Sequence, residues 1–417
     1  MGTETADGLA RRALRAISVD WSLLKRRRDL RLLMGGYTVS LLGGEFTQVA
    51  LAVQVYALTH SSLRVGLLGA AEFVPVIALA LVGGAMADAF DRRRLIWGAE
   101  LAAAFVSAAL LVNALLPHPM LWVLYVAAAL FSAASAVLRP PLDALMPRLV
   151  ERDELKTASA LTWSLASVAT VAGPAFSGVV IAATSVAAAY AVDVASFGAS
   201  LTAFALMRTP PPPSDAERPS LRGILESLQY AWSRQELLGS YAIDIAAMFF
   251  AMPFALFPAF AQRYGGTEVV GLLYAAPGAG AILAMLTSGW ATRVHRNGAA
   301  ITLAACGWGA GVALFGIAHT LWLALAFLVL AGAADAISGI FRGALWNETI
   351  PDRLRGRLAG VEMISWSSGP LLGNVRAGAS ASWLGLTGAV VVGGAACVGA
   401  SLALAAALPR FWRYRGA

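Results

Sequence analysis

The feature that most constrains the fold is a series of twelve long apolar segments. A helix of about 20 apolar residues is enough to cross a bilayer. The segments lie near residues 32–56, 65–87, 95–116, 120–139, 158–181, 184–207, 237–261, 268–291, 298–318, 320–341, 357–379 and 383–408. The sequence therefore predicts an all-α membrane protein with twelve transmembrane helices.

The composition excludes the usual soluble classes. Hydrophobic residues make up 59% of the chain and charged residues only 13%, whereas soluble domains contain about 25% charged residues. Such a chain is not a soluble enzyme, a disordered protein or a secreted disulfide scaffold. Two isolated cysteines and four scattered histidines give no metal-ligand spacing, so we expect no metal and no cofactor.

The basic residues predict the orientation in the membrane. If both termini are cytoplasmic, 28 of the 31 Lys and Arg residues fall in cytoplasmic segments, as the positive-inside rule requires. The net charge of +7 then reflects topology, and we expect no nucleic-acid partner.

We expect five segments along the chain. They are a cytoplasmic N-terminal segment (1–31), a six-helix half (32–207), a cytoplasmic linker (208–236), a second six-helix half (237–408) and a cytoplasmic tail (409–417). In the linker, Leu221, Leu225, Leu228 and Trp232 recur at helical spacing among charged residues, which indicates an amphipathic helix on the inner membrane face. A solvated linker is the alternative.

The two halves share sequence landmarks. The matched positions are Gly84 with Gly289, Arg139 with Arg342, Pro147 with Pro351 and Pro174 with Pro370, at offsets of 205, 203, 204 and 196 residues. A nearly constant offset favours duplication and two pseudo-symmetric halves. Transporters built in this way bind substrate between the halves, near the midplane.

The loop after the second span carries a charged motif. Gly84, Asp88, Arg92 and Arg93 have the spacing of the signature loop of the major facilitator superfamily, which this stretch resembles. Two positions depart from that pattern, because Ala89 and Asp91 replace the usual Arg and Gly.

The resemblance implies that this loop is a conformational latch. Its members would be Gly84, Asp88, Asp91, Arg92 and Arg93, and the resemblance implies that the latch stabilises the outward-open state. Near the cytoplasmic end of the third span we expect Glu100 to pair with Arg92, Arg93 and Arg94.

Further stretches narrow the resemblance to one branch of the superfamily. Residues 139–158, 193–197 and 346–374 are similar to the branch that contains enterobactin exporters and macrolide-efflux-like proteins. That similarity implies a twelve-helix secondary exporter, usually driven by proton uptake.

A glycine–proline pair occurs in both halves. Gly173-Pro174 lies in the fifth span and Gly369-Pro370 in the eleventh. The first pair resembles the antiporter motif of drug exporters. Proline removes a backbone donor and glycine allows close packing, so each pair predicts a kink that can flex or seal; an ordinary packing kink is the alternative.

Ionisable residues at bilayer depth are costly and therefore candidate sites. Glu45, with Gln48 on the same helix face, and Asp244, one turn after Tyr241, lie in the first and seventh spans, which are symmetry mates and line the cavity in this fold. The further candidates for proton coupling or substrate binding are Asp193, Asp335 and Arg376, followed by Glu72 and Glu362. Each has a structural alternative, such as a cap or a packing pair.

These observations predict a monomeric secondary efflux transporter in the cytoplasmic membrane that exchanges protons for an amphipathic drug, antibiotic or siderophore. Each of the two lysines, Lys25 and Lys156, follows a leucine, which excludes the phosphate loop of an ATP-driven pump. The alternatives are a lipid or nutrient carrier without proton exchange and a non-transporting membrane sensor. We see no catalytic motif and expect no enzyme.

Overall fold

The computed structural model describes residues 21–89, 91–151, 153–208 and 229–416. Within its helices, the side chains of residues 80–89, 143–144, 352–353, 355–357 and 359–361 lie outside the description. The amphipathic helix predicted for the linker falls mostly on residues 209–228, which also lie outside the described residues.

The described residues before position 209 form the first group of helices. They are α2 (Ser22–Arg26), α3 (Arg28–Thr59), α4 (Ser62–Ala89), α5 (Arg92–Leu115), α6 (Leu121–Leu145), the short η1 (Met146–Arg148), α7 (Leu155–Ala183) and α8 (Val186–Leu206). A side-chain cap begins two of these helices, α5 and α8. Asp91 caps α5 by accepting the N–H groups of Arg93 and Arg94 at 2.8 and 3.4 Å, and Ser185 caps α8 by accepting that of Ala188 at 3.3 Å.

The described residues after position 228 form the second group. They are α10 (Gln235–Ala251), η2 (Phe254–Leu256), α11 (Phe257–Tyr264), α12 (Thr267–Leu286), η3 (Ser288–Arg293), α13 (Asn297–Ile317), α14 (Leu321–Thr349), α15 (Asp352–Ala407) and α16 (Pro409–Trp412). Thr320 begins α14 by accepting the N–H of Leu323 at 3.4 Å.

The span count agrees with the twelve predicted segments. Within the described residues, eleven helices are long and apolar enough to cross a membrane. The last of these covers 46 residues, Glu362–Ala407, roughly twice the length that one crossing needs. Gly385 divides it, with a φ of 70° and a ψ of 172°, a conformation that only glycine adopts easily. The two parts of α15 therefore correspond to the predicted eleventh and twelfth spans, and the break at Gly385 falls two residues inside the predicted start of the twelfth, 383.

The seventh span is broken where the sequence predicts one continuous segment over 237–261. The helix stops at Ala251 and resumes at Phe257, because Pro253 and Pro258 have no N–H to donate. Other helices satisfy the exposed backbone groups. The Asn374 side-chain oxygen accepts the N–H of Ala255 at 3.0 Å, and the Tyr274 hydroxyl donates to the carbonyl of Phe254 at 3.0 Å.

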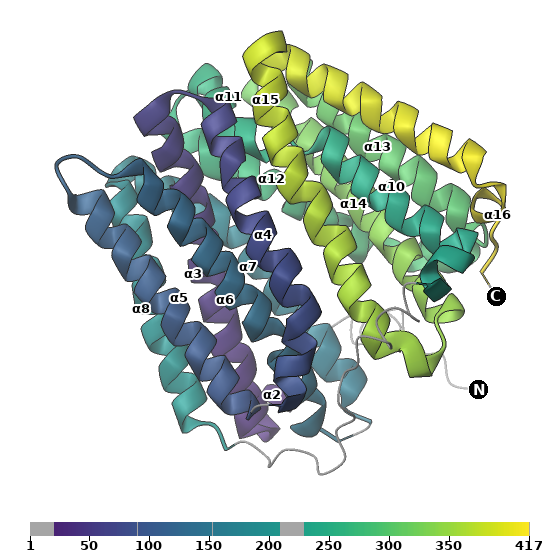
Figure 1. The fold of residues 1–417 in the computed structure, drawn as a ribbon, viewed down its shortest axis with the longest axis horizontal. Helices are drawn as coiled ribbons and strands as arrows, with labels where there is room; N and C mark the ends of the chain where they lie inside the picture. Colours follow the sequence, from purple (N-terminus) through teal and green to yellow (C-terminus); the bar gives the residue numbers. More distant parts are fainter. Residues whose placement is uncertain (1–20, 90, 152, 209–228, 417) are drawn as a thin grey trace, which may run out of the picture.

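The helices form two bundles that meet most closely near one end of the molecule, and the ribbons diverge toward the other end (Figure 1). α4 packs against α15, and α7 packs against α12. At the second contact, a Cβ added to Gly178 would lie 2.6 Å from the Cα of Gly271. At the first, Gly378 packs on the backbone of Ser62, and an added Cβ would lie 2.8 Å from the Cα of Leu63. Small residues let the backbones approach this closely, so the bundles are sealed at the end that carries the short connection after Thr59.

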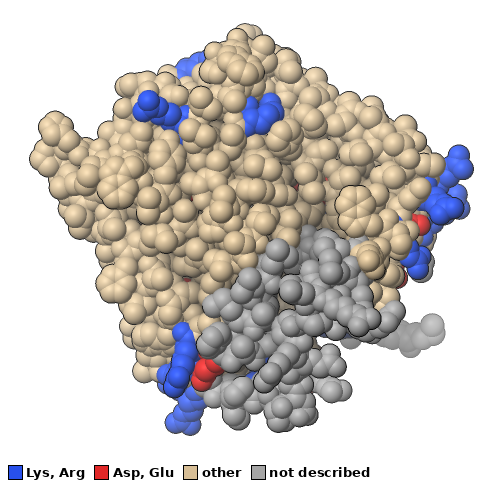
Figure 2. All heavy atoms as spheres, in the orientation of Figure 1, with Lys and Arg blue, Asp and Glu red and all other residues tan. Residues whose placement is uncertain are grey.

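The surface agrees with a membrane protein. Figure 2 shows a wide band without charged side chains, and the basic and acidic side chains visible in this view gather toward its edges. Many large apolar side chains of the spans are exposed, for example Phe105 and Trp322 at 68% and 78%. In a bilayer these side chains contact lipid.

Candidate functional site

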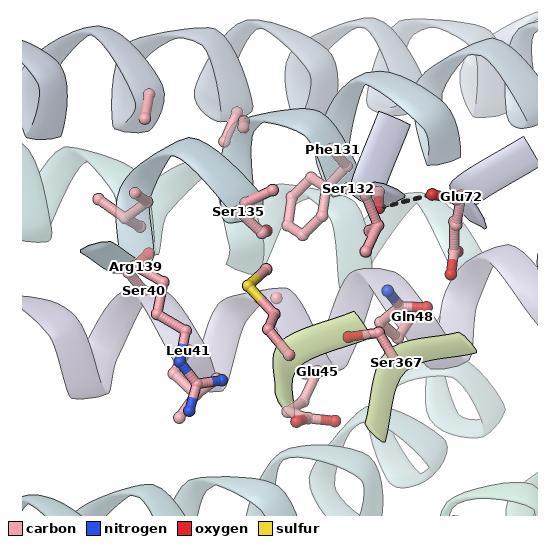
Figure 3. Close-up of a pocket in the computed structure, with 18 of the residues that line it drawn as sticks. Ser40, Leu41, Glu45, Gln48, Glu72, Phe131, Ser132, Ser135, Arg139 and Ser367 are labelled. Atoms are coloured by element: carbon pink, nitrogen blue, oxygen red, sulfur yellow. Dashed lines mark hydrogen bonds between the residues drawn. The ribbon is translucent and has the colours of Figure 1, made fainter. Parts of the chain in front are cut away.

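A cavity of about 420 Å³ lies among the helices of the first bundle and is closed on one side by α15 of the second. Its apolar wall includes Phe131, Phe197 and Trp366, and its polar wall includes Tyr37, Ser40, Gln48, Ser132, Ser135 and Ser367. Figure 3 shows Glu45, Gln48 and Ser367 near the ribbon of α15. The cavity thus combines aromatic surface with a few polar groups, as small-molecule sites do.

Two acidic side chains line this cavity, Glu45 from α3 and Glu72 from α4. Among the described residues, neither carboxylate has a hydrogen-bond or ion-pair partner. The Ser132 hydroxyl beside Glu72 donates to the backbone carbonyl of that residue at 3.1 Å, as Figure 3 shows. Gln48, one helical turn from Glu45, is exposed to the cavity. The predicted pair Glu45 and Gln48 is therefore brought together, and Glu72 joins it.

The glycine of each predicted kink packs against one position of the neighbouring helix. A Cβ added to Gly173 would lie 2.5 Å from the Cβ of Glu45, and one added to Gly369 would lie 2.7 Å from the Cβ of Met248. Glu45 and Met248 are 203 residues apart, the offset of the internal repeat. The same helix contact thus occurs in both bundles, with an acid in one and a thioether in the other. Pro174 and Pro370 follow inside continuous helices.

Arg139 lies at one end of the cavity. Its guanidinium carbon is 4.8 Å from the centre of the Trp366 ring on α15, so the contact joins the two bundles. The Arg139 side chain therefore lies over an aromatic ring of the other bundle.

The second bundle contains a buried ion pair outside the cavity. Arg342 of α14 forms a salt bridge with Asp244 of α10 and lies 3.8 Å from Asp335. The Ser365 hydroxyl of α15 lies 3.5 Å from the second oxygen of Asp244. Asp244 and Asp335, predicted separately, are thus brought together by an arginine that sequence reasoning missed.

Tyr241 lies beside this ion pair. Its ring is 5.5 Å from that of Trp346, and its hydroxyl is buried without a hydrogen-bond partner among the described residues. The Tyr241 side chain therefore contributes mainly apolar packing in this conformation.

Two further buried carboxylates are held by hydroxyl groups of the first bundle. Asp193 of α8 accepts hydrogen bonds from Thr47 at 2.6 Å and from Ser107. Such contacts tie three helices together, which agrees with the structural alternative for Asp193.

Glu100 has different partners from those expected. The Ser40 hydroxyl donates to Glu100 at 2.9 Å, and the Ser200 hydroxyl donates to its other oxygen. The predicted pairing with Arg92, Arg93 and Arg94 is therefore wrong for this conformation. The reason is that Glu100 faces the bundle interior, fully buried, whereas the arginines lie at the helix start.

The predicted latch is only partly within the described residues. Gly84 and Asp88 belong to α4, but their side chains lie outside the description. Asp91 caps α5, and Arg93 donates to the carbonyl of Ala205 on α8 at 3.2 Å. These contacts stay within the first bundle.

Arg376 makes contacts with backbone oxygens. Its guanidinium donates to the carbonyls of Phe249 at 3.1 Å and Ala389 at 3.4 Å. These bonds hold α10 and the two parts of α15 together. The structure does not bring Arg376 to the cavity.

From the sequence alone, Glu72 ranks below the leading acidic candidates, and neither Arg139 nor Arg342 is proposed as a site residue. A signal for the arginines was present, since they are one of the four matched pairs of the internal repeat. Glu72 could have been found from its position in the second span, ten residues after the start of α4, but no local pattern marks the side facing the cavity.

Known proteins resemble this chain over most of its length. A family model described as "Transmembrane secretion effector" matches residues 21–413. The enterobactin exporter EntS of Citrobacter koseri is 29% identical over 402 residues, covering 94% of this chain and 95% of the relative. EntS of Escherichia coli O1:K1 / APEC is 29% identical over 372 residues, covering 87% of each.

Solved structures show the same fold at low sequence identity. A bacterial homologue of the human lysosomal transporter Spinster, in an inward-facing and unoccupied conformation, has a TM-score of 0.69 at 15% identity, covering 93% of this chain and 96% of the other. The nucleoside transporter NupG has a TM-score of 0.72 at 13% identity, covering 92% and 99%. The predicted twelve-helix architecture is therefore confirmed as a fold.

Proposed function

The chain belongs to the transmembrane secretion effector family of the major facilitator superfamily, and from that premise we propose that it exports an amphipathic small molecule in exchange for protons. As a member of that family it is a multi-pass efflux transporter and not an enzyme. We propose the coupling to protons, the class of the cargo, and the residues that bind the cargo or the protons.

The observation that carries the proposal is the cavity with its two acidic side chains. Glu45 and Glu72 line it without a basic partner among the described residues, and burying an unpaired carboxylate is costly unless it takes up a proton. Each acid can therefore gain or lose a proton as the cavity dries or hydrates. A protonated cavity would release a cargo that the ionised cavity binds.

We propose that this conformation is open toward the cytosol. The bundles are sealed at the end with the short connection after Thr59, which the positive-inside rule places outside the cell. Both termini and the linker 208–236 would then be cytoplasmic. Residues 32–207 and 237–408 would move as two rigid halves of a monomer, as in other transporters built from repeats.

The latch and the kinks take roles in the opposite conformation. With the cytoplasmic ends apart, the contacts of Asp91 and Arg93 with described residues lie within their own bundle. We propose that Gly84, Asp88, Asp91, Arg92 and Arg93 engage the second bundle when those ends close. The tight contacts of Gly173 and Gly369 with neighbouring helices would keep each Gly–Pro kink in register during the change.

The proposed cargo is a siderophore or a drug of similar character. The relatives are named as enterobactin exporters, and the cavity offers the rings of Phe131, Phe197 and Trp366 beside polar groups. Its volume of about 420 Å³ lies in the range of roughly 300–1,000 Å³ that small-molecule sites occupy.

Proteoliposomes test the coupling. With an acidic lumen, we expect accumulation of a catecholate siderophore together with proton efflux, reported by a pH dye in the lumen. Glu45→Gln should reduce gradient-driven accumulation at least tenfold while exchange between labelled and unlabelled cargo continues. Glu268→Gln, an exposed glutamate at the sealed end, is the matched control and should leave accumulation unchanged.

Two results would overturn the proposal. Accumulation that ignores the pH gradient in the unaltered protein would indicate a lipid or nutrient carrier without proton exchange. Full gradient-driven accumulation by the combined Glu45→Gln and Glu72→Gln variant would show that these two acids do not couple transport to protons.

A further inference from the structure

A second hollow of about 420 Å³ lies at one end of the first bundle, away from the cargo cavity. Three separate parts of the chain form it, namely the junction of α2 and α3, the short helix η1 and the end of α8. It is lined by Arg26, Arg27, Arg28, Asp29, Arg148, Leu149 and Arg208. We call it the basic hollow.

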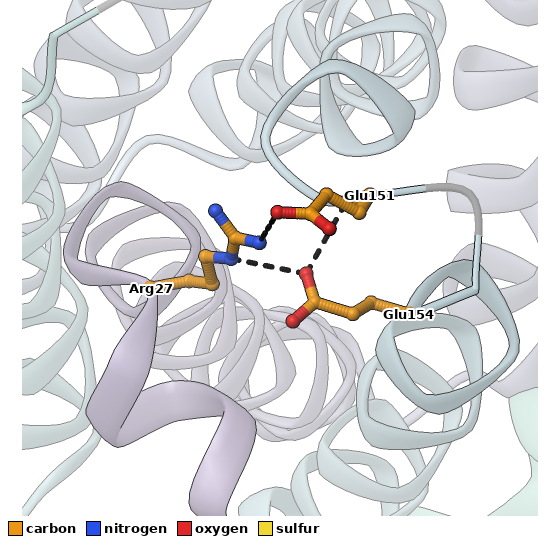
Figure 4. A network of polar contacts seen from close by, with 3 residues as sticks. All are labelled: Arg27, Glu151 and Glu154. Carbon is orange, nitrogen blue, oxygen red and sulfur yellow. Dashed lines mark hydrogen bonds and ion pairs between the residues drawn. The ribbon is translucent and has the colours of Figure 1, made fainter.

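Arg27 is engaged with two acids of the connection between α6 and α7. Its guanidinium donates to Glu151 and, at 3.0 Å, to Glu154, as Figure 4 shows. The N–H of Glu151 donates to Glu154 at 3.2 Å. These contacts hold the junction of α2 and α3 against the connection between α6 and α7. The two acids lie outside the hollow and neutralise the charge of Arg27.

The rest of the lining is strongly basic. Of the residues that the structure describes, four arginines besides Arg27 line the hollow, together with one carboxylate, Asp29. Asp29 is held in place, because it accepts the backbone N–H of Arg208 at 3.2 Å and lies 3.8 Å from Arg28. Among the described residues, basic side chains thus outnumber acidic ones in the lining of a concave site, and the contacts of Arg27 and Asp29 fix its frame.

The location of the basic hollow points to a lipid. It lies at the level where α3 begins and α8 ends, which is the cytoplasmic membrane surface in the predicted orientation. Trp21, next to α2, is 51% exposed, and tryptophan favours the headgroup region of a bilayer. The cytoplasmic leaflet supplies anionic lipids to basic pockets at this depth.

We propose that the basic hollow binds the headgroup of an anionic phospholipid of the inner leaflet, with its phosphate oxygens accepting hydrogen bonds from Arg28 and Arg208. Guanidinium groups bind phosphate through paired hydrogen bonds. The bound lipid would join the start of α3 to the end of α8. Because the site is separate from the cargo cavity, its test does not depend on transport.

Arg28→Gln together with Arg208→Gln is the informative variant. Arg208 holds Asp29 through its backbone N–H, and Arg28 makes only a loose contact with its neighbour, so the frame of the hollow should survive. The matched control is Arg410→Gln with Arg413→Gln, two arginines near the C-terminus that do not line the hollow.

The measurement is lipid binding by the purified full chain in detergent, with phosphatidylglycerol compared with phosphatidylcholine, by native mass spectrometry and thermal unfolding. We expect one tightly bound phosphatidylglycerol and a rise in the unfolding midpoint that phosphatidylcholine does not produce. The variant should bind phosphatidylglycerol roughly 30-fold more weakly, and the control should bind it as the unaltered protein does.

Three outcomes would overturn the proposal. The first is equal stabilisation by the two lipids. The second is an unchanged phosphatidylglycerol affinity in a variant that elutes as a folded monomer. The third is the same midpoint rise with inorganic phosphate alone, because the hollow would then be a site for free anions.

Discussion

The two bundles place their charges differently at equivalent positions. In the first, Glu45 packs against Gly173 and faces the cavity, while its counterpart in the second is Met248. In the second, Asp244 pairs with Arg342. The position 203 residues before Asp244 is Leu41, an apolar residue that lines the same cavity as Arg139.

This difference separates the tasks of the two halves. An acid without a basic partner can change its protonation state at low cost to the fold, whereas an acid bound to an arginine holds helices together. Under the proposed function, the first bundle would therefore supply the titrating groups, and the second would be the fixed body against which they move. The comparison teaches that the same helix contact can carry an acid in one bundle and a thioether in the other, so that matched positions differ in charge.

The largest expected effect is on the stability of the second bundle. Arg342→Gln leaves the carboxylate of Asp244 buried without its strongest partner, which costs about 3–5 kcal/mol. Unfolding by detergent titration would measure it. Asp244→Asn in the same chain should restore much of the loss, and a double variant as unstable as Arg342→Gln alone would contradict the assignment.

Substitutions of Gly173 and Gly369 should lower the stability of the protein by similar amounts. Gly173→Ala and Gly369→Ala each place a methyl group less than 3 Å from a neighbouring Cβ, and overpacking of this kind costs about 1–3 kcal/mol. Thermal unfolding would show the common loss. Only Gly173→Ala should also slow gradient-driven transport, since it displaces Glu45, and equal slowing by Gly369→Ala would break the comparison.

Neutralising the acid of the first bundle should barely change its stability. Glu45→Gln removes a carboxyl group with no partner among the described residues, so we expect a change in unfolding free energy within about 0.5 kcal/mol or a small gain. The same detergent titration applies. A loss as large as that of Arg342→Gln would mean that Glu45 is structurally paired.

The smallest effect concerns the ends of the bundles. The backbone N–H of Glu151 and the guanidinium of Arg27 lower the pKa of the Glu154 carboxyl below its ordinary 4.5. A lowered folded pKa contributes stability above pH 4.5, and that contribution is lost as the pH falls through the folded value. The unfolding midpoint should fall slightly more in acid for the unaltered protein than for Glu154→Gln.

A neutral contact in the second bundle provides the control for this pH effect. The Tyr230 hydroxyl donates to the carbonyl of Thr349 at 2.7 Å. Tyr230→Phe should lower the midpoint by the same small amount at every pH between 3.5 and 7, values chosen to bracket roughly the Glu154 titration. A pH-dependent loss there would show that the acid effect is not specific to Glu154.

The spans were predictable because each depends on a local run of apolar residues. Glu45 and Gln48 were also predictable as a pair, because their spacing puts them on one helix face. The pairing of Asp244 with Arg342 was not, since it joins residues 98 positions apart and depends on the crossing of α10 and α14. Glu100 was misassigned because its nearest charges in sequence are not its nearest polar groups in space.

The single-residue turn at Gly385 has a mechanical consequence. Two membrane-crossing rods joined by one residue form a linkage with a single joint and no slack, so a displacement of the rod before Gly385 is transmitted to the rod after it. The Arg376 guanidinium also braces the joint, because it donates to Ala389 on the far side. Spectroscopic labels on these two rods should therefore report one motion, and lengthening the joint by a few flexible residues should decouple them.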